Sequence, residues 1–314
     1  MLMNKGMISY NQSRLSVIFN KIVMAFIDVF CHPICINACL HYSYGRLMHR
    51  NWGDDINIYM LEKLWNRKLS YLYYSTLSIR SQKDNYLAIG STLGMLTNEH
   101  TIVWGSGTID DSRVLYCHPK KILAVRGPLT RQWLLKQGVD CPEVYGDPAL
   151  LLPRLYTPSV QKKRYKLGII PHYDDFNHPV LSRLKSDPNV LFIKMEGYDD
   201  WTSVIDQIAS CDYIASSSLH GLIVAEAYGV PNLWLEISGK LLGGHFKFHD
   251  FFLSLGKDRK SPFLLHSDMT VDDILNTKND YQKGFIDLQP LIQARIQQAS
   301  AKLRNVFVKA LLWC

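Results

Sequence analysis

One segment of the chain combines hydroxyl groups and an imidazole in an order that could bind and protonate an anion. Residues 216–221 read Ser-Ser-Ser-Leu-His-Gly and follow the largely apolar run 212–215, which we expect to be a buried strand. Serine hydroxyls and the unpaired amides at a helix N-terminus make an anion site. His220 could hold a phosphate there or donate a proton to it. The alternative is that Ser217 or Ser218 only caps the following helix.

An arginine occupies the same kind of position earlier in the chain. Arg126 follows the apolar run 121–125 and precedes Gly127 and Pro128, and a proline suits the first position of a helix. A guanidinium in that place can bind a carboxylate or a phosphate through two parallel hydrogen bonds. The alternative is a structural ion pair with a neighbouring carboxylate.

Two adjacent carboxylates could supply acid–base chemistry. The polar sequence Asn51-Trp52-Gly53-Asp54-Asp55 precedes apolar residues at helical spacing. Paired carboxylates can act as acid and base when their surroundings separate their pKa values. Either aspartate could equally be an ordinary cap at the start of the helix.

These segments share a repeated pattern of elements. Short apolar runs at 86–89, 101–104 and 121–125 each end in a glycine-containing loop, and apolar runs resume at 166–172 and 190–193. Strand, glycine loop and helix in alternation are typical of a parallel α/β sheet, in which ligands bind at the carboxyl ends of the strands. We therefore predict an α/β fold with two Rossmann-like lobes that face each other across a cleft.

The boundaries of the lobes follow from where the composition changes. Prolines, polar residues and a basic cluster between residues 155 and 166 indicate a linker. We expect an N-terminal helical segment over residues 1–40 and a first Rossmann-like lobe over 41–157. A second lobe would cover 166–287, followed by a C-terminal helix over 288–314.

The N-terminal segment is apolar but is not predicted to cross a membrane. Its richest stretch, residues 17–40, is interrupted by polar and charged residues, and no signal-peptide cleavage pattern follows it. The apolar residues do not sort onto one clean helical face, so we expect the segment to pack against the body of the protein. The alternative is that it lies on a membrane surface.

Composition narrows the class of partner. A chain of 314 residues with 47% hydrophobic and 20% charged residues is typical of a globular protein. Its 35 Lys and Arg exceed its 28 Asp and Glu by 7, and this modest basic excess suits an acidic ligand. The densest basic cluster, at 162–166, is too short for a nucleic-acid surface, so we expect no nucleic-acid partner.

Seven cysteines in a chain of this size indicate a reducing compartment and not a disulfide framework. Cys31, Cys35 and Cys39 would share one face if their segment were helical. Three thiols along one continuous helix cannot easily surround a tetrahedral metal ion. We therefore predict no metal site, with the thiols packing as small hydrophobic groups.

Taken together, the motifs resemble those of the polysaccharide pyruvyltransferases, and most closely the bacterial exopolysaccharide and capsule members that place a pyruvate ketal on a sugar. They run in the family's order over residues 50–256, and little of the resemblance lies outside that range. The motifs are Asn51-Trp52-Gly53-Asp54-Asp55, Trp104-Gly105-Ser106-Gly107, Val125-Arg126-Gly127-Pro128-Leu129, Tyr145-Gly146-Asp147-Pro148-Ala149, Ser217-Ser218-Leu219-His220-Gly221, Glu226-Ala227-Tyr228-Gly229-Val230-Pro231 and Gly243-Gly244-His245-Phe246-Lys247-Phe248.

The resemblance implies a fold like that of the GT-B glycosyltransferases. It also implies transfer of pyruvate from phosphoenolpyruvate to two hydroxyls of a sugar, which forms a ketal and releases phosphate. The acceptor would be a polysaccharide or a lipid-linked repeat unit at the inner face of the cytoplasmic membrane. We accordingly expect a cytoplasmic enzyme, leave peripheral membrane contact open, and expect no cofactor beyond the donor substrate.

The resemblance also assigns roles to individual residues. Arg126 matches the family's donor-binding arginine, and His220 matches the histidine of an Arg-Leu-His motif in which Ser218 here replaces the arginine. The missing cation could be supplied by Lys240, Lys247 or Arg131. We expect His220, Asp54 and Asp55 to be catalytic, Arg126, Ser217, Ser218, Leu219 and Lys247 to bind the donor, and Asn51, Trp52 and Trp104 to bind the acceptor.

The residues suit the chemistry that such a transfer requires. Phosphoenolpyruvate carries a carboxylate and a phosphate, so the reaction needs an anion clamp, a general acid and a general base. Asp54 or Asp55 would take the proton of a sugar hydroxyl. His220, kept charged by the bound dianion, would be an acid that donates its proton either to the methylene carbon or to the departing phosphate.

Two other functions fit parts of the pattern. A nucleotide-sugar glycosyltransferase of GT-B type would need an acidic residue for the ribose after a strand of the second lobe, for which Glu236 is an imperfect candidate. A non-catalytic sugar-binding protein of a polysaccharide assembly complex would keep the fold without needing His220 beside Arg126.

Overall fold

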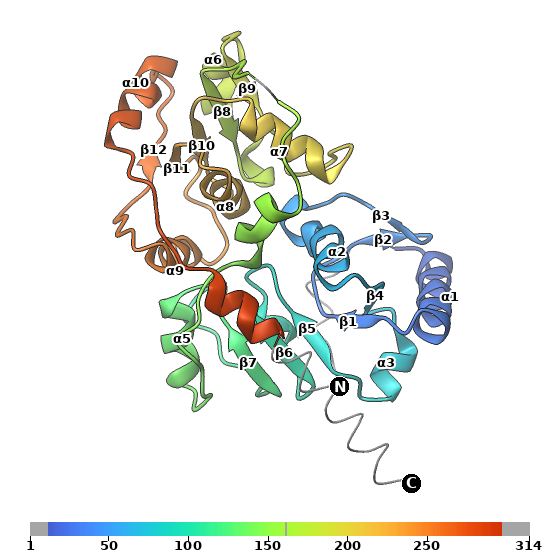
Figure 1. Cartoon of the computed structure of the whole chain (residues 1–314). Helices are drawn as coiled ribbons and strands as arrows, with labels where there is room; N and C mark the ends of the chain where they lie inside the picture. The colour runs from blue at the N-terminus through green and yellow to red at the C-terminus, as the bar shows by residue number, and fades with distance from the viewer. Residues whose placement is uncertain (1–11, 161, 297–314) are drawn as a thin grey trace, which may run out of the picture.

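Two parallel β-sheets, one in each half of the chain, dominate the computed structural model (Figure 1). The structure describes residues 12–160 and 162–296. The first sheet has the strand order β4-β1-β5-β6-β7 and the second β12-β11-β10-β8-β9, and all neighbouring strands in both are parallel. The predicted α/β class with Rossmann-like parallel sheets is therefore confirmed, whereas the GT-B arrangement of the lobes stays a prediction.

Short apolar runs form the sheet of the first lobe. Its strands are β1 (Ile34–Ile36), β4 (Leu69–Tyr71), β5 (Asn85–Leu87), β6 (Thr101–Trp104) and β7 (Lys121–Ala124), and its helices are α1 (Arg14–Phe30), α2 (Trp52–Trp65), α3 (Thr76–Arg80), α4 (Leu93–Leu96) and α5 (Pro128–Leu135). An antiparallel hairpin of β2 (Tyr42–Ser43) and β3 (Arg46–Leu47) forms a separate small sheet. Strands β6 and β7 lie in the predicted apolar runs, and β5 overlaps the run predicted at 86–89.

The second lobe repeats the alternation. Its strands are β8 (Leu167–Ile170), β9 (Val190–Phe192), β10 (Ile214–Ser216), β11 (Asn232–Glu236) and β12 (Phe263–Leu264), and its helices are α6 (Ser182–Lys185), α7 (Trp201–Ala209), α8 (Leu219–Ala227), α9 (Phe246–Ser254) and α10 (Val271–Asn276). Short 3-10 helices lie at Pro148–Arg154, Tyr173–Asp175, Pro179–Leu181 and Thr277–Asp280. Strands β8 and β10 are buried along their whole length, as expected for the centre of a parallel sheet.

The N-terminal segment differs from its prediction. Helix α1 ends at Phe30, and Ile34–Ile36 form β1, which pairs with β4 on one side and β5 on the other. The prediction of a helical segment over 1–40 is therefore wrong beyond Phe30. Pairing with a strand on each side satisfies the backbone N–H and C=O groups of residues 34–36, which favours the extended conformation over helix. Cys35 lies in this strand, so the three thiols do not share a helix face.

The last described segment returns from the second lobe to the first. Residues 289–296 are helical and drawn in red in Figure 1. Trp104 Nε1 donates to Leu291 O at 2.8 Å, and Arg295 Nη1 donates to Leu64 O at 2.6 Å. The part of the predicted C-terminal helix over 297–314 lies outside the described residues. Within residues 12–160 and 162–296, the chain thus passes from the first lobe to the second and back again.

Candidate active site

Two asparagines hold the start of α2 beside the carboxyl end of β5. Asn51 caps the helix: its Oδ1 accepts from Gly53 N at 3.0 Å, and its Nδ2 donates to Asp54 Oδ2 at 2.7 Å. Asn57 Nδ2 donates to Ile89 O at 3.1 Å, and Ile89 N donates back to Asn57 Oδ1 at 3.0 Å. Because Asn51 is the cap, the neighbouring aspartates are not needed for capping.

The two aspartates face different surroundings. Asp55 is 1% exposed and accepts a hydrogen bond from the Tyr198 hydroxyl of the second lobe at 2.8 Å. Burial raises the pKa of Asp55 to about 6, against the opposing effects of Tyr198 and His49. Burial and the charge of Asp55 raise the pKa of Asp54 to about 7, against the opposing effect of Lys247. Asp54 can therefore exchange a proton near neutral pH, whereas Asp55 ties the two lobes together.

The serines of the second lobe build the loop between β10 and α8. Ser217 Oγ accepts from His172 N at 2.8 Å. Ser216 Oγ donates to Ile170 O at 3.1 Å and accepts from Ser218 N at 3.0 Å. Ser218 is the N-cap residue of α8, but its side chain makes no capping hydrogen bond. The first turn of α8 therefore has no side-chain cap and keeps the character of an anion site.

His220 lies in the first turn of α8 and packs against the start of α2. A Cβ on Gly53 would lie 2.0 Å from His220 Nδ1, so only glycine leaves room for the imidazole ring. His220 Nε2 is buried and has no hydrogen-bond partner among the described residues. Burial, with the positive charges of Arg126 and Lys247, lowers the pKa of His220 to about 3. The imidazole is thus neutral at pH 7 unless a bound anion changes its surroundings.

Helix α9 brings a lysine to the same place. Lys247 lies in its first turn, where burial and Arg126 lower the lysine pKa to about 8 and Asp54 opposes that effect. Burial and the charge of Lys247 also lower the pKa of His172. The structure therefore brings together Asp54 from α2, His220 from α8 and Lys247 from α9, with His172 beside them.

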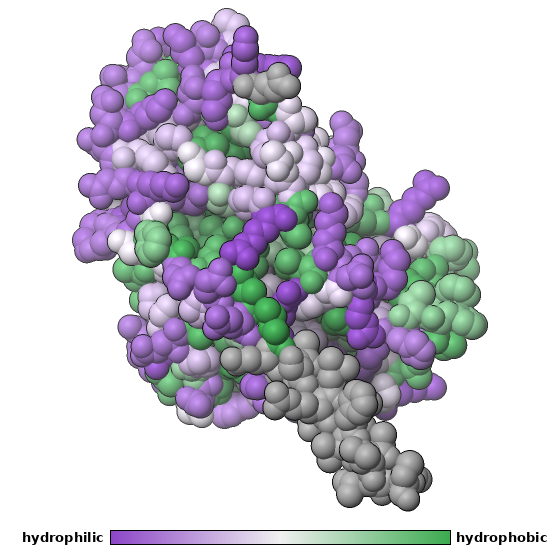
Figure 2. Space-filling model, in the orientation of Figure 1, coloured by the Kyte–Doolittle hydropathy of each residue, from purple (hydrophilic) through white to green (hydrophobic). Residues whose placement is uncertain are grey.

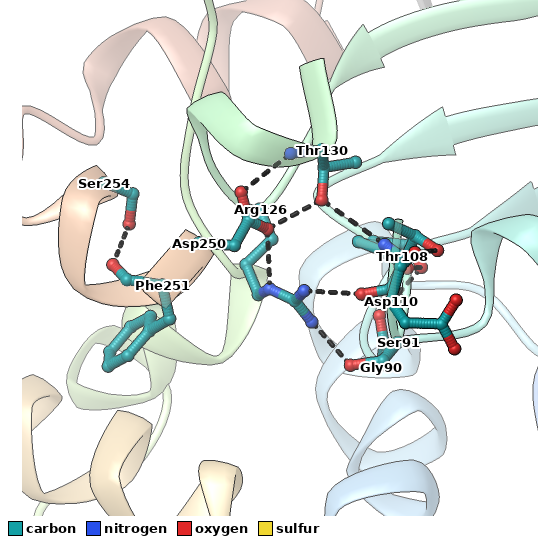
Figure 3. Close-up of polar contacts among 11 residues, drawn as sticks. Gly90, Ser91, Thr108, Asp110, Arg126, Thr130, Asp250, Phe251 and Ser254 are labelled. Carbon is teal, nitrogen blue, oxygen red and sulfur yellow. Dashed lines mark hydrogen bonds and ion pairs between the residues drawn. The ribbon is translucent and has the colours of Figure 1, made fainter. Parts of the chain in front are cut away.

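The Arg126 side chain is anchored by three hydrogen bonds (Figure 3). The side chain is fully buried; Nε donates to Asp250 Oδ2 at 3.0 Å, Nη1 to Ser91 Oγ at 2.5 Å and Nη2 to Thr108 O at 2.8 Å. Asp250 also accepts from Thr130, from N at 2.9 Å and from Oγ1 at 2.7 Å. The ion pair that the sequence left as an alternative is therefore present, and the guanidinium has no surface open to solvent.

The two tryptophans predicted to bind the acceptor are buried. Trp52 and Trp104 are both 0% exposed. Trp52 Nε1 donates to Trp201 O at 2.9 Å and its backbone N–H to Met195 O at 2.7 Å, while the Trp104 indole is bonded to Leu291. An indole without exposed surface cannot stack on a sugar, so the structure contradicts this prediction. The Trp52 indole instead links α2 to α7 through Trp201, and the Trp104 indole links β6 to the helix over residues 289–296 through Leu291.

Arg131, Lys240 and Leu219 were also considered for donor binding, and their side chains do not join the cluster of Asp54, His220 and Lys247. Arg131 Nη2 is 3.2 Å from Glu143 Oε1, and Lys240 lies on an exposed loop. Leu219 is 7% exposed, so only its backbone N–H could serve a ligand at the start of α8. Of the three predicted substitutes for the missing arginine, Lys247 is the one that interacts electrostatically with His220.

Two thiols of the N-terminal segment, those of Cys35 and Cys39, stay protonated at neutral pH. Burial raises the pKa of Cys35 to about 11 and that of Cys39 to about 12, whereas Cys31 is exposed. Within residues 12–160 and 162–296, no three or more His, Cys, Asp or Glu side chains are grouped as metal ligands. Cys35 and Cys39 are poor ligands in this state, because metal binding requires the thiolate.

Asp250 and Tyr198 are among the residues that build the site without having been predicted. Asp250 lies three residues after Lys247, and this spacing places both on one face of α9, which is a signal the sequence does carry. Tyr198 stands alone after Gly197 and has no comparable signal. Its contact with Asp55 follows only from the way the lobes pack.

Comparison with known proteins identifies relatives of the chain. Residues 46–239 match the family model for polysaccharide pyruvyl transferase. The chain is 30% identical over 234 residues to an uncharacterised protein of Acanthamoeba polyphaga mimivirus, covering 72% of this chain and 79% of that protein. It is 29% identical over 222 residues to the succinoglycan biosynthesis protein ExoV of Rhizobium meliloti (strain 1021), covering 68% of this chain and 64% of ExoV. The chain thus spans less than two thirds of the length of ExoV.

One solved structure shows a weak likeness. A functionally uncharacterised protein of Klebsiella pneumoniae superposes with a TM-score of 0.45 at 11% identity, over 81% of this chain and 100% of that chain. At this score the likeness carries no argument about fold or function. The family match covers more than half of the chain and contains Asp54, Arg126 and His220. The chain belongs to the polysaccharide pyruvyl transferase family.

Proposed function

We propose that this protein transfers pyruvate from phosphoenolpyruvate to two hydroxyls of one sugar and releases phosphate. The observation that carries the proposal is the buried, unpartnered Nε2 of His220, which lies under the influence of the positive charges of Arg126 and Lys247. Two cations suit a donor with a carboxylate and a phosphate. Family membership and the likeness to a succinoglycan biosynthesis protein support a polysaccharide, or its lipid-linked repeat unit, as the acceptor.

The proposed reaction balances its protons. A general acid adds a proton to the methylene carbon of phosphoenolpyruvate, which makes C2 electrophilic, and a sugar hydroxyl bonds to C2 and gives its proton to a general base. The bond from C2 to the phosphate oxygen then breaks. A second hydroxyl bonds to C2 and its proton goes to phosphate, so the products are the ketal and inorganic phosphate.

The pKa values support roles opposite to those expected from the sequence. Asp54, with a pKa of about 7, keeps a protonated fraction at neutral pH and is our proposed acid. His220, with a pKa of about 3 in the free protein, is a neutral imidazole, and the negative charge of the donor would strengthen it as the base. Lys247 would bind the donor directly, and Arg126 would act on it through its charge.

The loop residues complete the proposed site. The Ser218 hydroxyl and the backbone amides of the first turn of α8 would bind the donor phosphate, while the fully buried Ser217 holds the loop through its hydrogen bond with His172 N. Asn51 is partly exposed beside Asp54, and we propose that it contacts the acceptor hydroxyls. Glu236, the candidate for a nucleotide-sugar ribose, has Oε1 3.2 Å from His245 Nε2 instead.

Donor specificity tests the proposal. Phosphate release should require both phosphoenolpyruvate and a sugar acceptor with two nearby hydroxyls, and UDP-sugars should not replace the donor. Asp54→Asn should lower turnover by about 10²–10⁴, the usual effect of losing a general acid or base. The control Asp272→Asn, at an exposed position of α10, should keep wild-type turnover. Release of UDP from a nucleotide sugar would overturn the proposal in favour of a glycosyltransferase, and sugar binding without turnover would favour a non-catalytic protein.

A further inference from the structure

Helix α1 is attached to the protein by a polar stripe. Its buried residues, Ser16, Asn20, Met24 and Asp28, stand four apart and so share one side of the helix. Asn20 Nδ2 donates to Tyr42 O at 3.1 Å. Three of the four inward residues are polar, which is the reverse of an ordinary surface helix.

The partners of this stripe explain why it faces inward. Asn20 Oδ1 accepts from Gly45 N at 2.7 Å in the β2–β3 hairpin, and Ser16 Oγ accepts from Tyr44 N at 3.1 Å. The Asp28 carboxylate accepts from the hydroxyls of Ser75, at the N-cap of α3, and of Ser78. The hairpin and α3 thus fix the orientation of α1 through hydrogen bonds.

The opposite side of α1 is apolar and exposed. Its large residues are 44–70% exposed: Leu15, Ile18, Phe19, Ile22, Phe26, Val29 and Phe30, which we call the outer face of α1. Figure 2 shows hydrophobic surface over α1, at the right of the molecule. The expectation that the apolar residues of this segment do not sort onto one clean face is wrong. The segment does pack against the body, as expected, through Met24 with Val23 and Ile27 beside it and through the polar hydrogen bonds. An apolar patch this continuous is unusual on a monomer and indicates an interaction surface.

Exposed cations border the outer face on both sides. At 100° per residue, Arg14 and Lys21 lie along one edge of it. Arg46 lies near the other edge, since a Cβ on the adjacent Gly45 would be 3.2 Å from Phe19. Within the described part of the chain, none of these three cations pairs with a carboxylate. The acidic residue of α1, Asp28, is buried on the polar stripe.

We propose that the outer face of α1 binds the surface of an anionic lipid bilayer, with the helix lying in the plane of the membrane. An apolar helix face suits the boundary of the acyl chains, and flanking Lys and Arg suit the lipid phosphates. No helix among the described residues is long and apolar enough to span a bilayer. The choice of a bilayer over a second protein rests in part on the proposed function, since a lipid-linked acceptor is met at a membrane surface.

Vesicle binding by the full-length protein tests this inference. We expect cosedimentation with vesicles of phosphatidylcholine and phosphatidylglycerol, weaker binding to phosphatidylcholine alone, and weakening by salt. Ile22→Gln with Phe26→Gln should lower binding by roughly tenfold or more. Arg14→Gln with Lys21→Gln should lower binding to the anionic vesicles and reduce the salt dependence.

A matched control separates the face from general hydrophobicity. Leu264→Gln with Phe285→Gln removes side chains that are 52% and 82% exposed and lie outside α1, and binding should be unchanged. Absence of wild-type binding to both vesicles, or an equal loss in the control, would overturn the proposal. So would a wild-type dimer that the Ile22 and Phe26 double variant converts to monomer, because a second copy would then cover the face.

A soluble acceptor keeps this test distinct from that of the proposed function. With a short water-soluble sugar, the Ile22 and Phe26 double variant should transfer pyruvate at the wild-type rate, since both side chains are exposed on α1, which contributes no residue to the proposed site. Vesicle binding without any transfer would overturn the proposed function and leave the membrane face supported. Pyruvate transfer without vesicle binding would support the proposed function and overturn the proposal that the outer face of α1 binds a membrane.

Discussion

At the scale of single residues, one physical cause moves two pKa values in opposite directions. Burial disfavours charge, so it raises the pKa of Asp54 to about 7 and lowers that of His220 to about 3. Both groups can therefore be neutral in the free protein, while Lys247 keeps its charge below its pKa of about 8. The cluster is prepared for an anion and for two proton transfers.

The first prediction concerns stability and Asp54. Its pKa of about 7 in the folded protein lies above the unfolded value of 3.8, so its contribution to stability is complete below pH 3.8 and is lost as the pH rises through 7. Asp54→Asn removes this loss and should stabilise the protein at pH 8 relative to wild type. The gain should be about 1–2 kcal/mol, because the carboxyl is partly exposed, and smaller at pH 4.

Urea unfolding at the two pH values measures the effect. Asp272→Asn, on the exposed surface of α10, should show no such pH-dependent difference. Equal destabilisation by Asp54→Asn at both pH values would mean that the charged Asp54 carboxylate does not destabilise the folded protein.

The second prediction separates catalysis from binding at His220. Gln keeps a hydrogen-bond donor but cannot accept and return a proton, so His220→Gln should bind phosphoenolpyruvate within about tenfold of wild type. Its turnover should fall by about 10²–10⁴. Calorimetric titration of the donor and turnover at saturation, on the same variant, give the two numbers. A parallel fall of both would make His220 a ligand only and would direct the search for the base to His172.

At the scale of elements, the contact between the starts of α2 and α8 sets the site. An added Cβ on Gly53 would lie 2.0 Å from the His220 ring, so Gly53→Ala must displace the ring or the helix start. Alanine otherwise favours helix, so any loss comes from this contact. We expect turnover to fall by about 10²-fold, as small misplacements of catalytic groups do.

Two further variants control this third prediction. Gly94→Ala, where the nearest atom to the added Cβ would be 3.4 Å away, should be close to wild type. Gly53→Ala with His220→Ala should recover folding stability without recovering activity. Full activity in Gly53→Ala alone would show that the two helices can separate without cost.

The element scale also shows how far sequence reasoning reaches. Apolar runs ending in glycine loops predicted β5, β6 and β7 of the first sheet, since buried parallel strands read as continuous hydrophobic segments. The strands β1 and β4 were missed, because Ile34–Ile36 lies in the stretch that we interpreted as helical and neither strand ends in a glycine loop. The orientation of α1 was missed as well, because its polar stripe acquires partners only from the hairpin and α3.

The site was predictable in its residues more than in their roles. Asp54, Arg126, His220 and Lys247 come together as motif order suggested. Burial could not be foreseen from residue types, and it makes the His220 imidazole neutral in the free protein. Burial also removed Trp52 from the acceptor, because its aromatic surface serves the core.

At the scale of the whole molecule, the two lobes are joined by a buried ion pair. Arg126 of the first lobe and Asp250 of the second are both 0% exposed. Breaking such a pair from one side leaves a buried charge, so Asp250→Asn should destabilise the protein by about 3–5 kcal/mol. It should also raise the KM for phosphoenolpyruvate, since the guanidinium loses its anchor.

An exposed pair between the same lobes provides the control for this fourth prediction. Arg50 Nη1 and Glu196 Oε1 are 3.3 Å apart, with side chains 41% and 44% exposed. Glu196→Gln should change the free energy of unfolding by less than about 1 kcal/mol. If denaturant unfolding gave similar losses of unfolding free energy for Asp250→Asn and Glu196→Gln, burial of the Arg126–Asp250 pair would not increase the cost of breaking it.

The return of the final described helix to the first lobe has a consequence for synthesis on the ribosome. The buried Trp104 indole bonds to Leu291, 187 residues later in the chain. At ordinary elongation rates that interval lasts roughly 10–40 s, during which the first lobe has emerged with part of its core uncovered. The nascent chain therefore presents an aggregation-prone surface for most of its translation, and chaperones that bind apolar segments should engage it before Leu291 appears.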